Sequence, residues 1–167
     1  DEVLLKMKYC GICGSDISMY KGLHPYASYP RILGHEVSAE IYYEGEPTGR
    51  TTSISPYKGC GVCYSCTSGN PHRCQKNQTM GVQRDGAFQE FIIVKKEGAN
   101  KKILERTNPF HSLPNKLQAV AEPFFVGLNA SLKIKSISDI YNILIIGAGP
   151  IGIYTALNLR QRFGNKV

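Results

Sequence analysis

Four closely spaced cysteines constrain the fold of this chain more than any other feature. They are Cys60, Cys63, Cys66 and Cys74, in the spacing C-x2-C-x2-C-x7-C. The surrounding segment is rich in Gly, Ser, Asn and Pro and has too few apolar residues to hold itself by packing, so a bound metal would supply the missing constraint. Repeated C-x2-C turns bring sulfurs together around a tetrahedral ion. We therefore expect residues 56–76 to form a lobe around a structural zinc, with disulfides or a redox site as the alternatives.

A second set of residues is typical of a catalytic metal. Cys13 lies between two glycines, His35 and Glu36 follow Gly34, and Glu122 precedes a proline. A thiolate, an imidazole and a carboxylate leave one metal position open, which is the arrangement of a catalytic zinc. Taken singly, a lone Cys is usually a small buried hydrophobe. The choice between Glu36 and Glu122 as the third ligand stays open.

Two polar residues near Cys13 have expected supporting roles. Asp16 is placed to hold the second nitrogen of His35, as carboxylates beside metal ligands commonly do. Ser15 is two residues from Cys13, close enough to exchange a proton at the metal. A third neighbour, Cys10, is interpreted as packing.

A glycine-rich turn, Gly147-Ala148-Gly149-Pro150-Ile151-Gly152, matches G-x-G-x-x-G. It follows an expected buried strand over 143–146 and opens an expected helix over 153–163 that Gly164 caps, which is the context that gives this motif its force. We expect Gly147, Gly149, Pro150, Ile151 and Gly152 to form a dinucleotide-binding turn, in which the second glycine lets the pyrophosphate approach the backbone and the third lets the helix pack close to the strand. A purely structural glycine turn is the alternative. The acidic residue that would distinguish NAD from NADP is expected ~20 residues further on, beyond this sequence.

Further strands are expected over 3–9, 37–43, 51–55 and 88–94, with turns over 44–50 and irregular chain over 98–118. A helix is expected to follow Pro123 and run to residue 132. On the 153–163 helix, Ile153, Ala156, Leu157 and Phe163 are expected to share the apolar face.

Charge and hydropathy limit the possible partners. The net charge is +7, but the Lys and Arg residues are scattered, so we expect a solvated surface and no nucleic-acid partner. No apolar run is long enough to span a bilayer, and no signal peptide opens the sequence. A reducing, cytoplasmic location with thiolate ligands is the expectation.

These motifs occur in an order that resembles the zinc-dependent medium-chain alcohol dehydrogenases, above all the branch of sorbitol, galactitol-phosphate and galactonate dehydrogenases. The resemblance rests on Gly11–Asp16, Gly34–Glu36, the cysteine lobe, Asp85-Gly86-Ala87-Phe88, Glu122-Pro123 and the glycine turn. It implies an α/β chain with a mostly β first domain, in which a GroES-like β-barrel is followed by the start of a Rossmann fold. The expected domains are 1–118 and 119–167, and we expect the chain to be a fragment.

The resemblance also implies a reaction. Cys13 and His35 would be catalytic zinc ligands with Glu36 or Glu122, and Ser15 would relay the proton. The activity would be reversible hydride transfer between a secondary alcohol of a polyol, sugar or sugar acid and NAD(P), in an enzyme that forms a dimer or tetramer. The alternatives are an inactive family member with a structural role and a zinc-ribbon nucleic-acid binder.

Overall fold

The computed structural model describes residues 2–95, 109–135 and 142–164. The chain divides into two compact units, Asp1–Val120 and Ala121–Val167, and each is described by itself. The first unit runs two residues past the boundary proposed from the sequence, because helix α4 (Asn115–Ala119) packs on its sheet.

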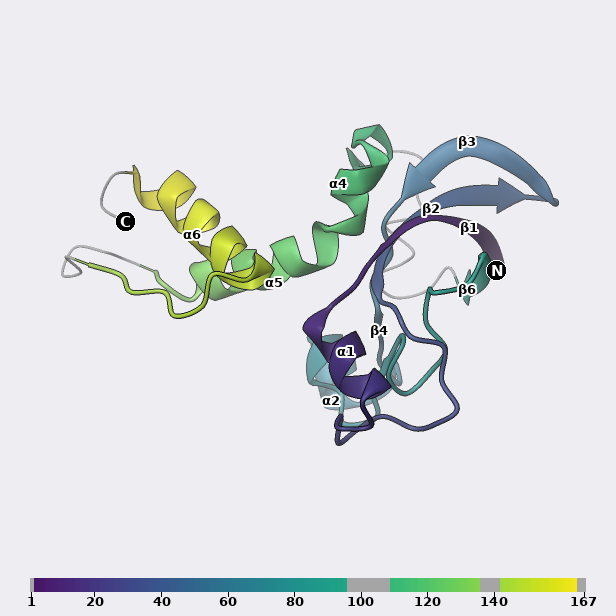
Figure 1. Ribbon diagram of the computed structural model, residues 1–167, viewed down its shortest axis with the longest axis horizontal. Coiled ribbons are helices and arrows are strands. Elements are labelled where there is room, and N and C mark those ends of the chain that lie inside the picture. The colour runs from purple at the N-terminus through teal and green to yellow at the C-terminus, as the bar shows by residue number, and fades with distance from the viewer. Residues whose placement is uncertain (1, 96–108, 136–141, 165–167) are drawn as a thin grey trace. The chain divides into compact units, whose positions relative to one another are not determined.

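An antiparallel four-stranded sheet in the order β3-β2-β1-β6 forms the frame of the first unit (Figure 1). Its strands are β1 (Glu2–Gly11), β2 (Glu36–Tyr43), β3 (Glu46–Thr52) and β6 (Phe91–Lys95). The strands expected over 3–9 and 37–43 are confirmed as the centre of this sheet.

The core of the first unit lies on one face of the sheet. Leu5 pairs with Ile41 on β2 and with Ile92 on β6, and all three side chains are buried. Burying one such side chain stabilises the fold by about 1.5–3 kcal/mol. The whole cluster comprises Leu5, Val37, Ala39, Ile41, Ile54, Met80, Ala87, Ile92 and Val94.

Two strand limits expected from the sequence are wrong. The strand expected over 51–55 begins earlier, because Glu44 and Gly45 have φ of 52° and 87° and close a two-residue hairpin turn directly after β2. Pro47 is tolerated inside β3 because this is an edge strand. The strand expected over 88–94 begins only at Phe91, and Phe88, its expected first residue, bonds to Leu33 of another loop.

Several helices of the first unit are absent from the sequence-based expectation. Helix α1 (Gly14–Tyr20) starts inside the first glycine turn, and α4 and the short η2 (Pro109–Ser112) interrupt the segment expected to be irregular. The fully buried Gln118 anchors α4: its amide nitrogen donates to Thr51 Oγ1 at 2.9 Å, and its oxygen accepts from Ser38 Oγ at 3.2 Å.

The cysteine lobe has almost no core of its own. It contains β4 (Tyr57–Lys58) paired with β5 (Gln78–Thr79), the single-turn helix α2 (Tyr64–Thr67) and the 3-10 turn η1 (Pro71–Arg73). From residue 57 to residue 79, Cys74 is the one buried residue. Apolar packing therefore contributes little to this segment.

The second unit is built from α5 (Ala121–Leu132) and α6 (Pro150–Phe163), which pack together. Gly127 permits the close approach, because a Cβ there would lie 2.8 Å from the Thr155 nitrogen. The Arg162 guanidinium donates to the backbone carbonyls of Ser131 and Ile134. Among the described residues, no helix combines the length and apolar character needed to cross a bilayer.

The start of α5 corrects another expectation. The helix begins before Pro123, not after it, because a proline in the first helical turn gives up no hydrogen bond. At the other end of the unit, α6 starts with Pro150 and ends at Phe163, and the following Gly164, with φ 63°, caps the helix as expected.

The expected buried strand over 143–146 is also wrong for this chain. Leu144 and Ile146 are 84% and 92% exposed. A buried parallel strand needs neighbouring strands and cover on both faces, and the described part of the second unit supplies neither. For the same reason Ile153 and Leu157 are exposed, while the buried residues of α6 are the ones that face α5.

Candidate metal centres

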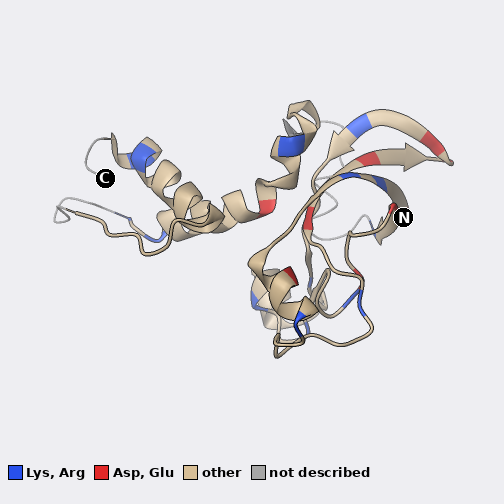
Figure 2. Cartoon of the chain, viewed as in Figure 1, with Lys and Arg blue, Asp and Glu red and all other residues tan. Residues whose placement is uncertain are grey.

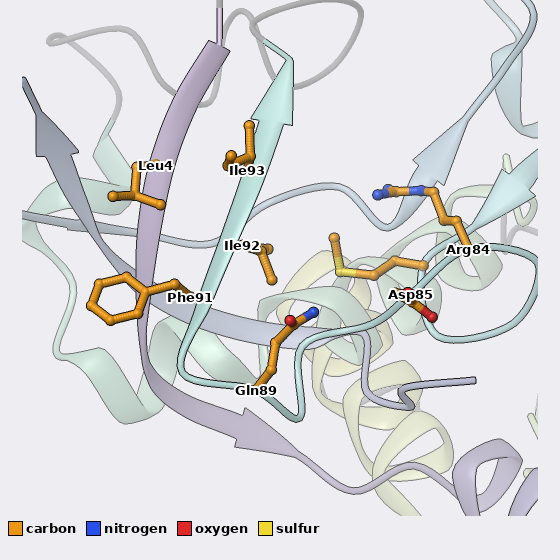
Figure 3. Close-up of a pocket in the computed structure, with 8 residues that line it drawn as sticks. Leu4, Arg84, Asp85, Gln89, Phe91, Ile92 and Ile93 are labelled. Carbon is orange, nitrogen blue, oxygen red and sulfur yellow. The ribbon is translucent and has the colours of Figure 1, made fainter. Parts of the chain in front are cut away.

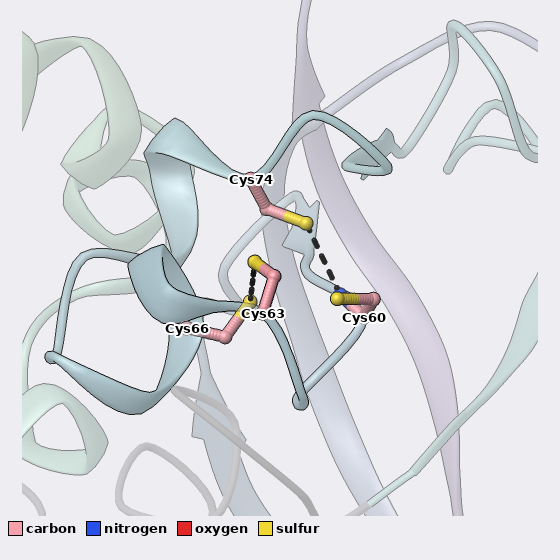
Figure 4. A group of neighbouring side chains, drawn as sticks. All are labelled: Cys60, Cys63, Cys66 and Cys74. Atoms are coloured by element: carbon pink, nitrogen blue, oxygen red, sulfur yellow. Dashed lines mark hydrogen bonds between the residues drawn. The ribbon is translucent and has the colours of Figure 1, made fainter.

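The four lobe cysteines converge on one point (Figure 4). Their sulfur atoms all lie within 4.8 Å of one another, and the Cys63 and Cys66 sulfurs are 3.6 Å apart. Thiolates at 2.3 Å from a tetrahedral zinc are separated by about 3.8 Å. All six cysteines of the chain are free, so the disulfide alternative has no support.

The crowding of these thiols affects their protonation. Backbone N–H groups of Val62 and Cys63 lower the pKa of Cys60 to about 6. The Gly61 N–H favours the thiolate of Cys66, but desolvation and the neighbouring sulfurs outweigh it and raise the pKa of Cys66 to about 11. Four adjacent thiolates repel one another, so the cluster needs a cation to hold all of them ionised.

A second cluster brings together Cys13, His35 and Glu36. One ligand atom from each lies within 4.8 Å of the other two, and the His35 and Glu36 side chains are buried. Cys13 immediately precedes α1, whereas His35 and Glu36 lead into β2. The two glycine turns singled out in the sequence are therefore adjacent in space.

Asp16 joins these two turns. In the first turn of α1, its Oδ2 accepts from the Cys13 N–H at 2.9 Å, while its Oδ1 accepts from the Gly34 N–H at 3.0 Å. The same Oδ1 lies 3.6 Å from His35 Nδ1, a buried nitrogen for which the structure gives no hydrogen bond. The acid thus lies beside the imidazole at the position expected from the sequence.

The charges of the cluster favour an ionised pair of the His35 imidazolium and the Cys13 thiolate. Burial disfavours the imidazolium of His35, but Asp16 and Cys13 outweigh it and raise its pKa to about 10. Hydrogen bonding to His35 and to Ser15 lowers the pKa of Cys13 despite burial. Burial raises the pKa of Glu36, the third member.

Glu36 has a defined position because Gly11 makes room for it. A Cβ built on Gly11 would lie 2.1 Å from Glu36 Oε2, so any larger residue would displace the carboxylate. Nearby, Cys10 packs against the core of the sheet, and burial raises its pKa to about 12. Cys10 is therefore outside both clusters.

Glu122 belongs to the second unit, in the first turn of α5. The ligand cluster of the first unit comprises Cys13, His35 and Glu36.

The glycines in the turn of the second unit differ in the space around them. A Cβ on Gly152 would lie 2.0 Å from the Gly147 carbonyl oxygen, so packing requires this glycine. A Cβ on Gly149 would meet nothing within 4 Å, although φ there is an ordinary −75°. Gly147 has φ 108°, which favours glycine, and Ile151 is half-exposed. Nothing within the described chain explains why residue 149 is a glycine.

A pocket of about 370 Å³ lies elsewhere in the first unit (Figure 3). It is lined by Leu4, Met80, Arg84, Asp85, Gln89, Phe91, Ile92 and Ile93. None of these residues belongs to either metal cluster. Arg84 donates to the Pro56 carbonyl, and Asp85 accepts from Arg31. Because these partners are distant in the sequence, the residue types alone did not predict the contacts.

Comparison with known proteins defines the class first. Residues 1–103 match the alcohol dehydrogenase GroES-like domain. The chain is 34% identical over 161 residues to L-galactonate-5-dehydrogenase of Escherichia coli K12, covering 93% of this chain and 45% of that protein. It is 37% identical over 176 residues to sorbitol dehydrogenase of Halalkalibacterium halodurans, covering 99% and 48%.

A solved structure agrees with these relatives. The RspB alcohol dehydrogenase of E. coli CFT073, complexed with NADH, superposes with a TM-score of 0.78 at 30% identity, over 97% of this chain and 46% of that one. The chain spans about half the length of the curated relatives it matches. The chain belongs to the alcohol dehydrogenase family defined by the GroES-like domain, and the expected fold class is confirmed.

Proposed function

We propose that this chain carries the metal-binding part of a zinc-dependent oxidoreductase that transfers hydride between a secondary alcohol and NAD or NADP. The observation that carries the proposal is the convergence of Cys13, His35 and Glu36 from two separate turns. The proposed substrates are polyols, sugars or sugar acids, since the similar proteins include an L-galactonate and a sorbitol dehydrogenase.

The residues present fit a catalytic zinc. Thiolate, imidazole and carboxylate are all ligands of this metal, and three protein ligands leave a position for the substrate. With Nδ1 of His35 directed at Asp16, Nε2 is the nitrogen available to a metal. Glu36 is the third ligand proposed from this cluster, and Glu122 is the alternative. When bound, zinc would act as a Lewis acid toward the alcohol oxygen.

The protein groups around that metal have distinct proposed tasks. Asp16 fixes the orientation of the imidazole, a role that buried carboxylates beside ligating histidines commonly have. Ser15 lies in the first turn of α1, two residues after Cys13, and is proposed to pass the substrate proton outward. Burial raises the pKa of Glu36, and a bound cation would favour its ionised form, which is the form that binds a metal.

The lobe is proposed to hold a second, structural zinc through Cys60, Cys63, Cys66 and Cys74. The sulfur spacing suits a tetrahedral ion, and the segment lacks an apolar core that would otherwise fix it. Four protein ligands fill the shell, so this centre leaves no open position for a substrate.

The cofactor is proposed to contact Gly147, Gly149, Pro150, Ile151 and Gly152. The open space beside Gly149 at the N-terminus of α6 supports this proposal, because a pyrophosphate must approach the backbone there. A homo-oligomer in the cytoplasm is proposed for the whole protein. The spread of Lys and Arg over many elements gives no support to a nucleic-acid partner (Figure 2).

The experiment that tests this function uses the longest polypeptide that contains this chain. NAD(P)H formation is measured with a panel of polyols and sugar acids, for the parent and for Cys13→Ala. We expect Cys13→Ala to abolish turnover, and Cys10→Ala, which removes a thiol outside the cluster, to retain it. Parent-like turnover by Cys13→Ala would refute the assignment.

A further inference from the structure

The loop that ends at His35 is held by a second loop that begins at Asp85. Three backbone hydrogen bonds join them. They run from the Gly86 N–H to the Ile32 carbonyl (2.7 Å), from the Ala87 N–H to the Gly34 carbonyl (2.9 Å) and from the Phe88 N–H to the Leu33 carbonyl (2.9 Å). The residues just before the imidazole thus have no freedom to shift independently of this second loop.

Asp85 adds side-chain bonds to the backbone ones. Its Oδ1 accepts from the Ile32 N–H at 3.3 Å and from Arg31 Nη1 at 3.0 Å. Arg31 in turn donates through Nε to the Ser28 carbonyl at 3.2 Å and through Nη2 to Ser28 Oγ at 2.7 Å. One carboxylate oxygen therefore connects the second loop to both the main chain and the side chains of the first.

The two loops are also in close contact. A Cβ on Gly86 would lie 2.4 Å from the carbonyl oxygens of both Leu33 and Gly34. Gly34 has φ 96°, and a Cβ there would lie 2.6 Å from the Phe88 ring. Neither loop has room for a side chain at these points, so a larger residue at either position would displace the backbone before His35.

Gly34 is thus fixed from two sides. Its N–H donates to Asp16 Oδ1, the same oxygen that lies 3.6 Å from His35 Nδ1, and its carbonyl accepts from the second loop. The next residue carries the imidazole. A displacement of Gly34 would move the ring relative to both Asp16 and Cys13.

We propose that Asp85 is a positioning residue for His35: with Arg31, it aligns the 31–34 loop so that the imidazole meets Cys13 and Glu36 at one metal ion. This inference rests on the metal centre proposed above. The Asp85 side chain is 58% exposed, and exposed ion pairs contribute little to global stability. Its effect should therefore appear at the metal rather than in the overall fold.

The two metal clusters of the chain allow an internal comparison. The chain is titrated with Co²⁺ in place of zinc, because a four-thiolate site and a Cys, His, carboxylate site give different visible spectra. Asp85→Ala is compared with Asp85→Asn, whose amide oxygen still accepts from the Ile32 N–H. Glu90→Ala is the matched control, since it removes an exposed acid whose salt bridge to Lys6 lies away from the cluster.

We expect Asp85→Ala to weaken Co²⁺ binding at the Cys13 cluster by up to about 10-fold, less than the loss of a partner bonded directly to a ligand, with a changed spectrum there. The four-cysteine centre should bind as before. Asp85→Asn should recover most of the loss, and Glu90→Ala should match the parent. If Asp85→Ala does not fold by circular dichroism, Arg31→Ala replaces it, with the same site-selective loss expected but smaller.

Three results would overturn the proposal. The first is parent-like Co²⁺ affinity at the Cys13 cluster in Asp85→Ala, or in Arg31→Ala where that variant replaces it. The second is equal weakening of both metal centres in a folded variant. The third is an Asp85→Asn variant that binds Co²⁺ as weakly as Asp85→Ala. A parent chain that binds Co²⁺ only at the four cysteines would instead contradict the proposed catalytic metal, which separates the two claims.

Discussion

The Asp16 carboxylate lies 3.6 Å from the imidazole Nδ1 of His35, and both residues are buried. Burial by itself would lower the pKa of His35, but Asp16 and Cys13 raise it to about 10 in the metal-free protein. The ring is therefore protonated at neutral pH. A protonated imidazole cannot bind a metal, so metal binding and proton release are coupled at this site.

This coupling predicts the pH dependence of the Cys13 centre. Metal affinity should rise about tenfold per pH unit between about pH 7 and pH 9, because each ion displaces about one proton from His35. If His35 had an ordinary pKa near 6.5 and Cys13 were already ionised, the affinity would change little over that range. Calorimetry in buffers of different ionisation enthalpy counts the protons. An affinity independent of pH would contradict the charge assignment, and Asp16→Asn should flatten the dependence.

A second prediction concerns the contact between Gly11 and Glu36. Gly11→Ala places a methyl group 2.1 Å from Glu36 Oε2, so we expect the free energy of unfolding to fall by about 1–3 kcal/mol. Gly14→Ala is the matched control, since a Cβ there meets nothing within 4 Å and the residue is helical. It should leave stability unchanged or raise it by up to about 1 kcal/mol. Equal effects in denaturant titrations would contradict the contact.

The glycine turn offers a matched pair of its own. Gly152→Ala should destabilise the start of α6 by about 1–3 kcal/mol, because its methyl group meets the Gly147 carbonyl oxygen at 2.0 Å. Gly149→Ala should change stability by less than about 0.5 kcal/mol, since the space beside it is open. Hydrogen exchange of the α6 amides measures both. Loss of protection in Gly149→Ala would show that this glycine has a structural role.

Metal removal should affect the lobe selectively. Between residues 57 and 79 Cys74 is the one buried residue, so a chelator should lower amide protection there by a factor on the order of 100, with β1 and β2 far less affected. Cys63→Ser should reproduce this loss, and Cys10→Ala should not. Full protection of the lobe after metal removal would show that packing alone holds it.

The sequence predicted the elements whose signal is local. Apolar alternation identified β1 and β2, and the cysteine spacing predicted a cluster that the structure contains. Local capping also accounts for Gly164 after α6. In each case the residues that determine the structure lie within a few positions of one another.

The misses involve partners that are distant in the sequence. Helix α4 depends on Gln118 reaching Ser38 and Thr51, and Phe88, the first residue of the expected strand, bonds instead to Leu33. No periodicity in the sequence shows that Arg31 meets Asp85, 54 positions away. The prediction of a buried strand over 143–146 failed for a different reason. Its composition predicts burial, but no neighbouring strand covers it among the described residues.

The most direct test of the account is a count of zinc per chain by elemental analysis. We predict two zinc ions in the parent chain, one in Cys13→Ala and two in Cys10→Ala. A parent chain with a single zinc, or a Cys13→Ala variant that keeps both, would contradict the claim that Cys13, His35 and Glu36 form a metal centre.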